Sequence, residues 1–208
     1  MLAGRLLQTV IFLAVTATAS AAQDADRAYV ADRAPAAQAA SASSDVLREW
    51  RAHPSGAPPS PALLRAIATW LSNQAALPAI DSYPAVKLVE SARIAAFRYA
   101  GLPPDATQPL AVAAAGQREV VAAYDDATLT IYLPLTWTGR SPAELSVVVH
   151  EMVHHIQNVA GMRFACAQAR EDAAYAAQAR WLELFGRTLA EDFDVDPFTL
   201  LAATLCAP

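Results

Sequence analysis

The most constraining feature of this chain is a helix-forming stretch that carries the sequence His-Glu-Met-Val-His at residues 150–154. Ser141, Pro142 and Glu144 predict a capping box with proline at the first helical position, and Gly161 is a typical helix stop. Between these ends, apolar residues cover most of the helix circumference. A helix that is apolar nearly all round is buried inside a domain, so the stretch predicts a central helix of a packed fold.

The polar residues of this helix share one sector. His150 and His154 lie one turn apart on the same face, so both imidazoles can bind a single zinc ion. Glu151 then lies beside the metal, where it can take a proton from a zinc-bound water and deliver it to a leaving amine. The alternative is a pair of solvated surface histidines. His155 points about 100° away and is either a second-shell residue or, as we favour, a hydrogen-bonded structural histidine.

A catalytic zinc ion usually has three protein ligands and one open position for water. The sequence from Arg163 to Phe185 predicts a second helix, on which Glu171 shares the apolar face and Asp172 the solvated face. A carboxylate on a buried face is costly unless it is paired or bound to a metal. Glu171 is therefore the predicted third ligand, with Asp172 and then Glu183 as alternatives. Glu171 could instead form a salt bridge with a neighbouring arginine.

Together, His150, Glu151 and His154, followed by a glutamate on the next helix, resemble the gluzincin type of zinc metallopeptidase. The wider pattern resembles an uncharacterised family of small secreted bacterial proteins with a minimal zincin core, over roughly residues 77 to 185. The residues that carry this wider resemblance are Leu77-Pro78-Ala79-Ile80, Arg98-Tyr99, Thr128 to Leu133, His150 to Gln157, and Glu171 to Leu182.

The resemblance implies an α+β, zincin-like minimal metallopeptidase domain, mostly helical with a small sheet or hairpin before the metal-binding helix. It also implies one Zn²⁺ per chain. In familiar gluzincins an aspartate often follows the third-ligand glutamate by four residues and orients a zinc-binding histidine. Tyr175 stands at that position here, so the sequence leaves this role unassigned.

Residues 120–133 predict a β-hairpin, because two β-branched and aromatic runs flank Asp125-Asp126-Ala127. In zincin-like folds a sheet edge strand just upstream of the metal helix lies along the cleft, where an extended peptide can pair with it. Alternatively, the hairpin only covers the buried helix. A hydrolase also needs a group that stabilises the oxyanion. The candidates are Tyr175, Tyr132, Tyr124 and His53.

Residues 1–22 predict a secretory signal peptide, because Arg5 precedes an apolar run and then small residues. The alternative is an uncleaved anchor, but the apolar run is short for a membrane span. Residues 23–44 are rich in alanine, serine and charged side chains, which predicts a disordered linker. The zincin-like domain then occupies residues 45–208, and we expect it to be periplasmic or secreted without stable membrane association.

Within this domain, helices are expected at residues 45–52 and from Ser60-Pro61 to about Leu71. Residues 86–99 fit either a strand followed by a helix or a single helix. Removal of the signal peptide leaves 14 basic and 20 acidic side chains, so the net charge changes from −5 to −6. The basic residues are scattered, which argues against nucleic acid as a partner.

The chain has two cysteines, Cys166 and Cys206. Export favours a disulfide between them, which would join the carboxy-terminal segment to the start of the helix that bears Glu171. The alternatives are two free buried thiols or Cys166 as a zinc ligand.

The predicted function is that of a zinc metallopeptidase acting on a peptide or protein substrate. His150, His154 and Glu171 hold the metal, and Glu151 is the general base and then the general acid. Tyr175, Tyr132 and His155 are the candidate transition-state or second-shell residues. Two alternatives remain: a zinc-dependent amidase on a non-protein or cell-wall substrate, and a metal-stabilised binding module without turnover.

Overall fold

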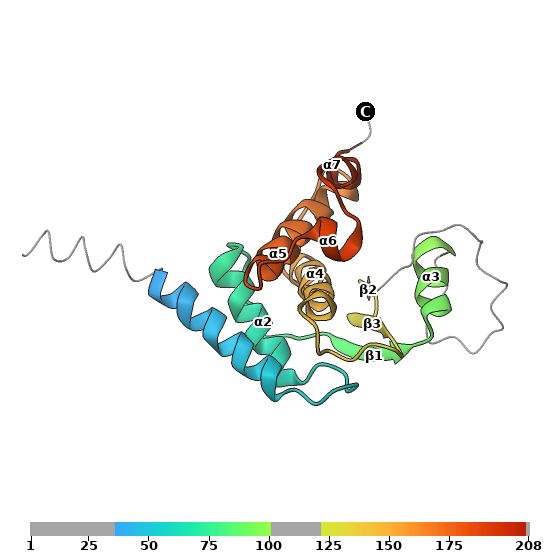
Figure 1. Ribbon diagram of the computed structural model, residues 1–208. Coiled ribbons are helices and arrows are strands. Elements are labelled where there is room, and N and C mark those ends of the chain that lie inside the picture. Colours follow the sequence, from blue (N-terminus) through green and yellow to red (C-terminus); the bar gives the residue numbers. More distant parts are fainter. Residues whose placement is uncertain (1–35, 101–121, 207–208) are drawn as a thin grey trace, which may run out of the picture. The chain divides into compact units, whose positions relative to one another are not determined.

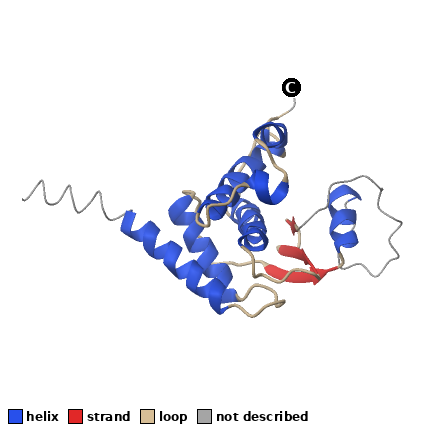
Figure 2. Ribbon diagram, in the orientation of Figure 1, coloured by secondary structure: helices blue, strands red, loops and turns tan. Residues whose placement is uncertain are grey.

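The computed structural model describes residues 36–100 and 122–206 of the 208-residue chain. By its internal contacts the chain divides into two units, Met1–Gln38 and Ala39–Pro208, and the sheet and helices α2 to α7 belong to the second. This unit is mainly helical with one small sheet (Figures 1 and 2). The predicted signal peptide at residues 1–22 lies outside the described residues. Among the residues described, none of the helices combines the length and apolarity that crossing a membrane requires.

The elements follow one another in the order α2, β1, α3, β2, β3, α4, a 3₁₀ turn, α5, α6 and α7. Their bounds are α2 Pro61–Gln74, β1 Ala85–Val89, α3 Ser91–Ala100, β2 Ala123–Asp125, β3 Thr130–Pro134, α4 Pro142–Val159, 3₁₀ turn Gln168–Arg170, α5 Glu171–Glu183, α6 Leu189–Phe193 and α7 Pro197–Thr204.

A helix over residues 36–52 precedes α2, so the linker predicted for residues 23–44 is helical from residue 36 onward. Alanine is the best helix former, and this helix buries Ala42 and Val46. The hydroxyl of Ser43 also accepts the indole N–H of Trp70 at 3.2 Å. The segment is poor in large apolar residues, so its composition did not predict the helix. Contacts of small buried side chains hold the helix in place. Residues 23–35 lie outside the described part of the chain.

The predicted start of α2 and both predicted ends of α4 are confirmed, whereas α2 continues to Gln74, beyond its predicted end near Leu71. The Ser60 side chain accepts the backbone N–H of Leu63 at 3.1 Å, which caps α2. Ser141 and Glu144 form the predicted capping box at the start of α4. Gly161 follows α4 with a φ of 63°, a conformation that glycine adopts without strain.

The sheet has three strands in the order β1–β3–β2, with β1 parallel and β2 antiparallel to β3. Residues 86–99 thus form the end of a strand followed by a helix, which decides between the two interpretations of that segment. The predicted hairpin is present as β2 and β3. However, β3, the strand that precedes α4 in the chain, is central in the described sheet, and β2 is one of its two edge strands. Residues 120 and 121 of the predicted hairpin lie outside the described residues.

The sheet packs on helices from both faces because side chains alternate along β3. Ile131 and Leu133 belong to the main core together with α2, α4 and α5. Tyr132, between them, points to the other face and packs in a separate cluster with Ile94 and Phe97 of α3. The sheet therefore lies between α4 and α3.

Helices α4 and α5 form an antiparallel pair. The indole of Trp181 donates to the Pro142 carbonyl at 2.9 Å near one end, and Gln157 donates to the Arg170 carbonyl at 2.9 Å near the other. The second helix begins at Glu171 rather than near Arg163, so its predicted start was wrong. The chain uses residues 160–170 to reverse its direction after α4, and a continuous helix over them would not allow this return.

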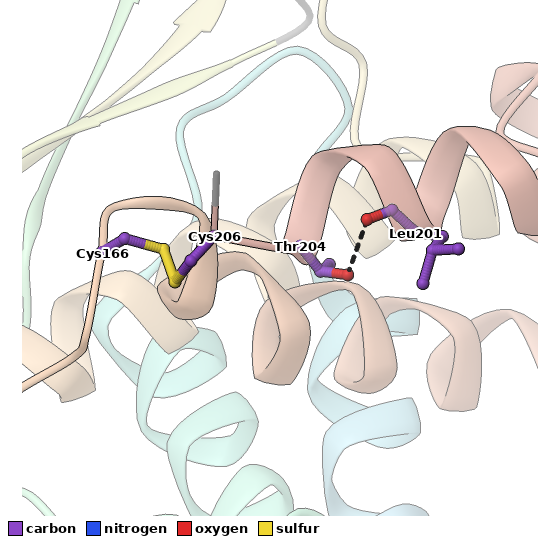
Figure 3. Close-up of a disulfide and its surroundings, with 4 residues drawn as sticks. All are labelled: Cys166, Leu201, Thr204 and Cys206. Carbon is purple, nitrogen blue, oxygen red and sulfur yellow. Dashed lines mark hydrogen bonds between the residues drawn. A yellow bond between two sulfur atoms is a disulfide. The ribbon is translucent and has the colours of Figure 1, made fainter. Parts of the chain in front are cut away.

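The predicted disulfide joins Cys166, in this reversal, to Cys206 after α7 (Figure 3). Neither free thiols nor a zinc-bound Cys166 is therefore present. The bond closes a loop of chain that contains α5, α6 and α7, so the carboxy-terminal segment is tied to the turn that precedes Glu171.

Candidate metal centre

Three ligand atoms converge between α4 and α5. The Nε2 atoms of His150 and His154 are 3.2 Å apart, and Oε2 of Glu171 lies 3.2 Å from the first and 3.4 Å from the second. Their side chains are only 12%, 10% and 16% exposed. The three residues predicted as ligands therefore form one cluster in the structure, and this cluster could hold a metal ion.

The spacing of these atoms fits a small tetrahedral ion. Two donors bound to Zn²⁺ at its usual bond lengths and at the tetrahedral angle lie about 3.3 Å apart. All three distances in the cluster are close to this value. Two imidazole nitrogens and one carboxylate oxygen are also a donor set that zinc accepts in catalytic sites.

The tautomer of His154 is fixed by Gln157. Its Nδ1 lies 3.1 Å from Oε1 of Gln157, and the amide nitrogen of that glutamine donates to the Arg170 carbonyl at 2.9 Å. A carbonyl can only accept, so the amide nitrogen must face Arg170 and the amide oxygen must face the histidine. His154 therefore carries its proton on Nδ1, and its Nε2 is left with a free lone pair.

The tautomer of His150 is fixed in the same way by Gln178. Nδ1 of His150 lies 3.0 Å from Oε1 of Gln178, whose amide nitrogen donates to the Ser146 hydroxyl at 3.1 Å. Ser146 in turn donates to the Ala143 carbonyl at 2.7 Å, so its oxygen accepts from the glutamine. The role of histidine orientation, which the sequence left unassigned, thus belongs to Gln157 and Gln178 rather than to Tyr175.

The result is three acceptors that face one another without a donor between them. Such a cluster is stable only around a cation, either a metal ion or a proton. Burial alone raises the pKa of Glu171, but its contacts with His150 and His154 outweigh burial and hold that pKa far below its usual range. For His154, burial lowers the pKa, whereas the contact with Glu171 raises it, and the net shift is upward. The cluster is therefore built to attract positive charge.

A cleft of about 740 Å³ opens beside the cluster. Its lining includes His150, Glu151, His154 and Glu171, while α6 and the following turn form a wall from Leu189 to Val195. Within the described residues, the carboxylate of Glu151 makes no hydrogen bond or salt bridge, although the residue is only 8% exposed. This acid is therefore available to act on a group bound at the centre.

Tyr175 also lines the cleft, with its ring edge-on to that of His150 at 4.8 Å between centroids. It stays a candidate for oxyanion stabilisation. Tyr132 does not line the cleft, because the alternation of β3 turns it toward α3, so the structure does not place this candidate beside the centre. His53 is packed against Trp137, and its Nε2 donates to the Ala57 carbonyl at 2.9 Å; it also lies outside the cleft lining.

His155 is a structural histidine, as favoured from the sequence. Its Nε2 donates to the Ser82 carbonyl at 2.9 Å, so its Nδ1 accepts from the Tyr124 hydroxyl at 3.1 Å. Burial lowers the pKa of His155, which favours this neutral form. The Tyr124 hydroxyl also accepts from Asn158, and Tyr124 is not among the residues that line the cleft.

The two alternative third ligands, Asp172 and Glu183, are both exposed and lie outside the cleft lining. Glu171 keeps the inward phase because α5 is regular from Glu171 onward. As the first residue of α5, it also lies at the positive end of the helix dipole, which favours its charged form.

Three functional candidates were missed at the level of sequence: Gln157, Gln178 and Arg98. Gln157 follows His154 by three residues and Gln178 follows Glu171 by seven, so helical phase alone places them near the centre. That signal was available for both. Arg98 lines the cleft from α3, a helix distant in the chain, and no local pattern indicates this.

Residues 56–208 match the family described as a domain of unknown function, DUF6647, and the chain belongs to that family. The matched region includes the three candidate ligands, both glutamines and the cysteines. Neither a curated protein nor a solved structure matches the chain.

Proposed function

We propose that this protein is a zinc-dependent hydrolase that cleaves peptide bonds, with a zincin-like arrangement of the gluzincin type. The observation that carries the proposal is the cluster of three acceptor atoms at 3.2–3.4 Å, in which two glutamine amides direct both Nε2 lone pairs inward. His150, His154 and Glu171 hold one Zn²⁺ per chain. This set leaves a fourth position for water or substrate.

Zinc bound there supplies a Lewis acid that lowers the pKa of a bound water. Glu151 is the base for that water because it lines the same cleft, follows the first ligand on α4 and has no hydrogen-bonded partner among the described residues. After taking the proton, the same carboxyl group can donate it to the leaving amine. Tyr175 stands next to His150 and can contact the bound carbonyl oxygen.

A peptide suits the shape of the site. The cleft of about 740 Å³ is in the range of ligand-binding cavities. Ala123 of β2 lines it, and in the described sheet β2 is paired with a strand on one side only, through β3. An extended substrate could add to the other side of β2 by backbone hydrogen bonds. The disulfide also supports an exported location, periplasmic or secreted, where peptides are available substrates.

The test combines metal analysis with one acidic substitution. The purified protein should contain about one zinc per chain, and a peptide library should be cleaved. Glu151→Gln should keep the zinc and lose activity by roughly 10²-fold or more, because the base is removed while the ligands stay. The control is Glu183→Gln, an exposed glutamate of α5 that should keep both properties.

Several results would contradict the proposal, each in a different way. A protein that binds no zinc, or that keeps full activity as Glu151→Gln, is not the enzyme described. A protein that binds zinc but cleaves no peptide leads to the alternative of an amidase on cell-wall or other non-protein amides, tested with the same variants. Zinc binding without turnover on either class would identify a metal-stabilised binding module.

A further inference from the structure

Arg98 reaches the candidate metal centre from α3, a helix that carries none of the three candidate ligands. It lies on α3, which packs on the sheet, and its side chain lines the cleft. Its Nη2 atom is 3.7 Å from Oε1 of Glu171. The other carboxylate oxygen, Oε2, is the one that contacts the two histidines. The guanidinium is therefore next to the position that a bound substrate must approach.

The contact with Glu171 does not use the hydrogen-bonding capacity of Arg98. A separation of 3.7 Å is too long for a hydrogen bond, and the side chain is 59% exposed. Among the described residues, Arg98 donates no hydrogen bond at all. Such an exposed, loose ion pair contributes little to stability. A guanidinium with open donors in a cleft is instead suited to bind a ligand.

Arg98 is also the only cationic side chain in the cleft lining among residues 36–100 and 122–206. The other charged groups there are carboxylates, and on the α6 wall Asp192 is already paired with Arg187. An anionic group of a substrate thus has a single protein cation to bind in this part of the site. Arginine binds carboxylates and similar oxyanions through two parallel N–H donors.

We infer that Arg98 binds a substrate oxygen that carries or gains negative charge next to the metal. This inference rests on the proposed function. The oxygen can come from two sources with the same chemistry: a free terminal carboxylate of the peptide, or the carbonyl oxygen that gains negative charge during the reaction. Arg98 contacts the substrate in either case and is not a metal ligand.

The first measurement uses inorganic phosphate and needs no turnover. Calorimetry on the zinc-loaded protein compares wild type with Arg98→Ala, Arg98→Lys and the control Arg93→Ala, which changes another arginine of α3 outside the cleft lining. Arg98→Ala should weaken phosphate binding by about tenfold or more, and Arg98→Lys should recover part of the loss. Zinc content should be unchanged in every variant. Equal phosphate affinity in wild type and Arg98→Ala would overturn the inference.

The second measurement separates the two sources with a matched pair of peptides, one with a free terminal carboxylate and one with an amide at that end. If Arg98 binds the terminal carboxylate, Arg98→Ala slows hydrolysis of the free peptide alone. If it binds the reacting oxygen, both peptides slow equally. No slowing of either peptide would overturn the inference while zinc-dependent hydrolysis stands. A protein without zinc would overturn the proposed function first.

Discussion

Gln178 should control the affinity of the proposed zinc centre without touching the metal. Its amide oxygen accepts the Nδ1 proton of His150 at 3.0 Å, and its amide nitrogen is anchored on Ser146 at 3.1 Å. Gln178→Leu keeps the size of the side chain but removes the acceptor. His150 is then free to carry its proton on Nε2, which blocks the lone pair that faces the centre.

The size of the effect follows from the kind of contact that is lost. Loss of a partner that orients a metal-binding histidine weakens metal affinity by about 10–100-fold. This corresponds to about 1.4–2.8 kcal/mol of binding free energy. Gln178→Glu should behave differently, because a carboxylate still accepts the Nδ1 proton and adds negative charge near the ion. We expect its zinc affinity to equal or exceed that of wild type.

The assay is competition for zinc with a chelating dye, with the free energy of unfolding of the zinc-free proteins measured by urea. The control is Gln74→Leu, which removes another hydrogen-bonded glutamine, one that is bonded to the helix over residues 36–52 and not to the centre. This control should change stability but not zinc affinity. A folded Gln178→Leu protein with wild-type zinc affinity would refute the role of the amide as the group that sets the tautomer.

Three further outcomes can be measured on the same material. Glu171→Gln should weaken zinc binding by more than the roughly 10–100-fold of an orienting partner, whereas Asp172→Asn, on an exposed side chain, should not; equal effects would reject the ligand assignment. In the zinc-free protein, burial lowers the pKa of His154 but nearby carboxylates raise it overall, so this group adds stability at low pH that is lost as pH rises through its folded pKa. Zinc requires the neutral imidazole, so the gain in melting temperature on adding zinc should widen between about pH 5.5 and pH 8; a constant gain would contradict this. Reduction of Cys166–Cys206, which are 40 residues apart, should cost about 4 kcal/mol and lower the melting temperature by roughly 10 °C; an unchanged melting curve would show that the bond adds no stability.

The sequence predicted best where several local signals agree. The cap at Ser141, the stop at Gly161 and the apolar surface between them specify α4 together, and the structure has this helix at residues 142–159. The inward phase of Glu171 was also predictable, because a buried carboxylate stands out on an apolar helix face. In both cases the information lies within a few turns of a single helix.

The features that the sequence did not indicate depend on chain segments that are distant in sequence. Whether Tyr132 faces the cleft depends on which side of the sheet α4 covers, and the alternation along β3 alone does not decide this. The start of α5 depends on the turn that α4 and the disulfide impose, which a helix-favouring composition cannot indicate. Arg98 reaches the centre only because α3 packs on the sheet after β1, a tertiary arrangement with no local pattern.

The antiparallel pairing of α4 and α5 also has a kinetic consequence. The ligands and their orienting glutamines all lie between residues 142 and 183, and the contact of His150 with Glu171 spans only 21 positions. By contrast, β1 must find β3 across α3 and the long segment after it, as Ala85 pairs with Thr130. Contacts between near neighbours in sequence form sooner, since less loop entropy is lost. We therefore expect the helical pair to form before β1 joins β3, so that zinc present during refolding would accelerate a step that precedes completion of the sheet.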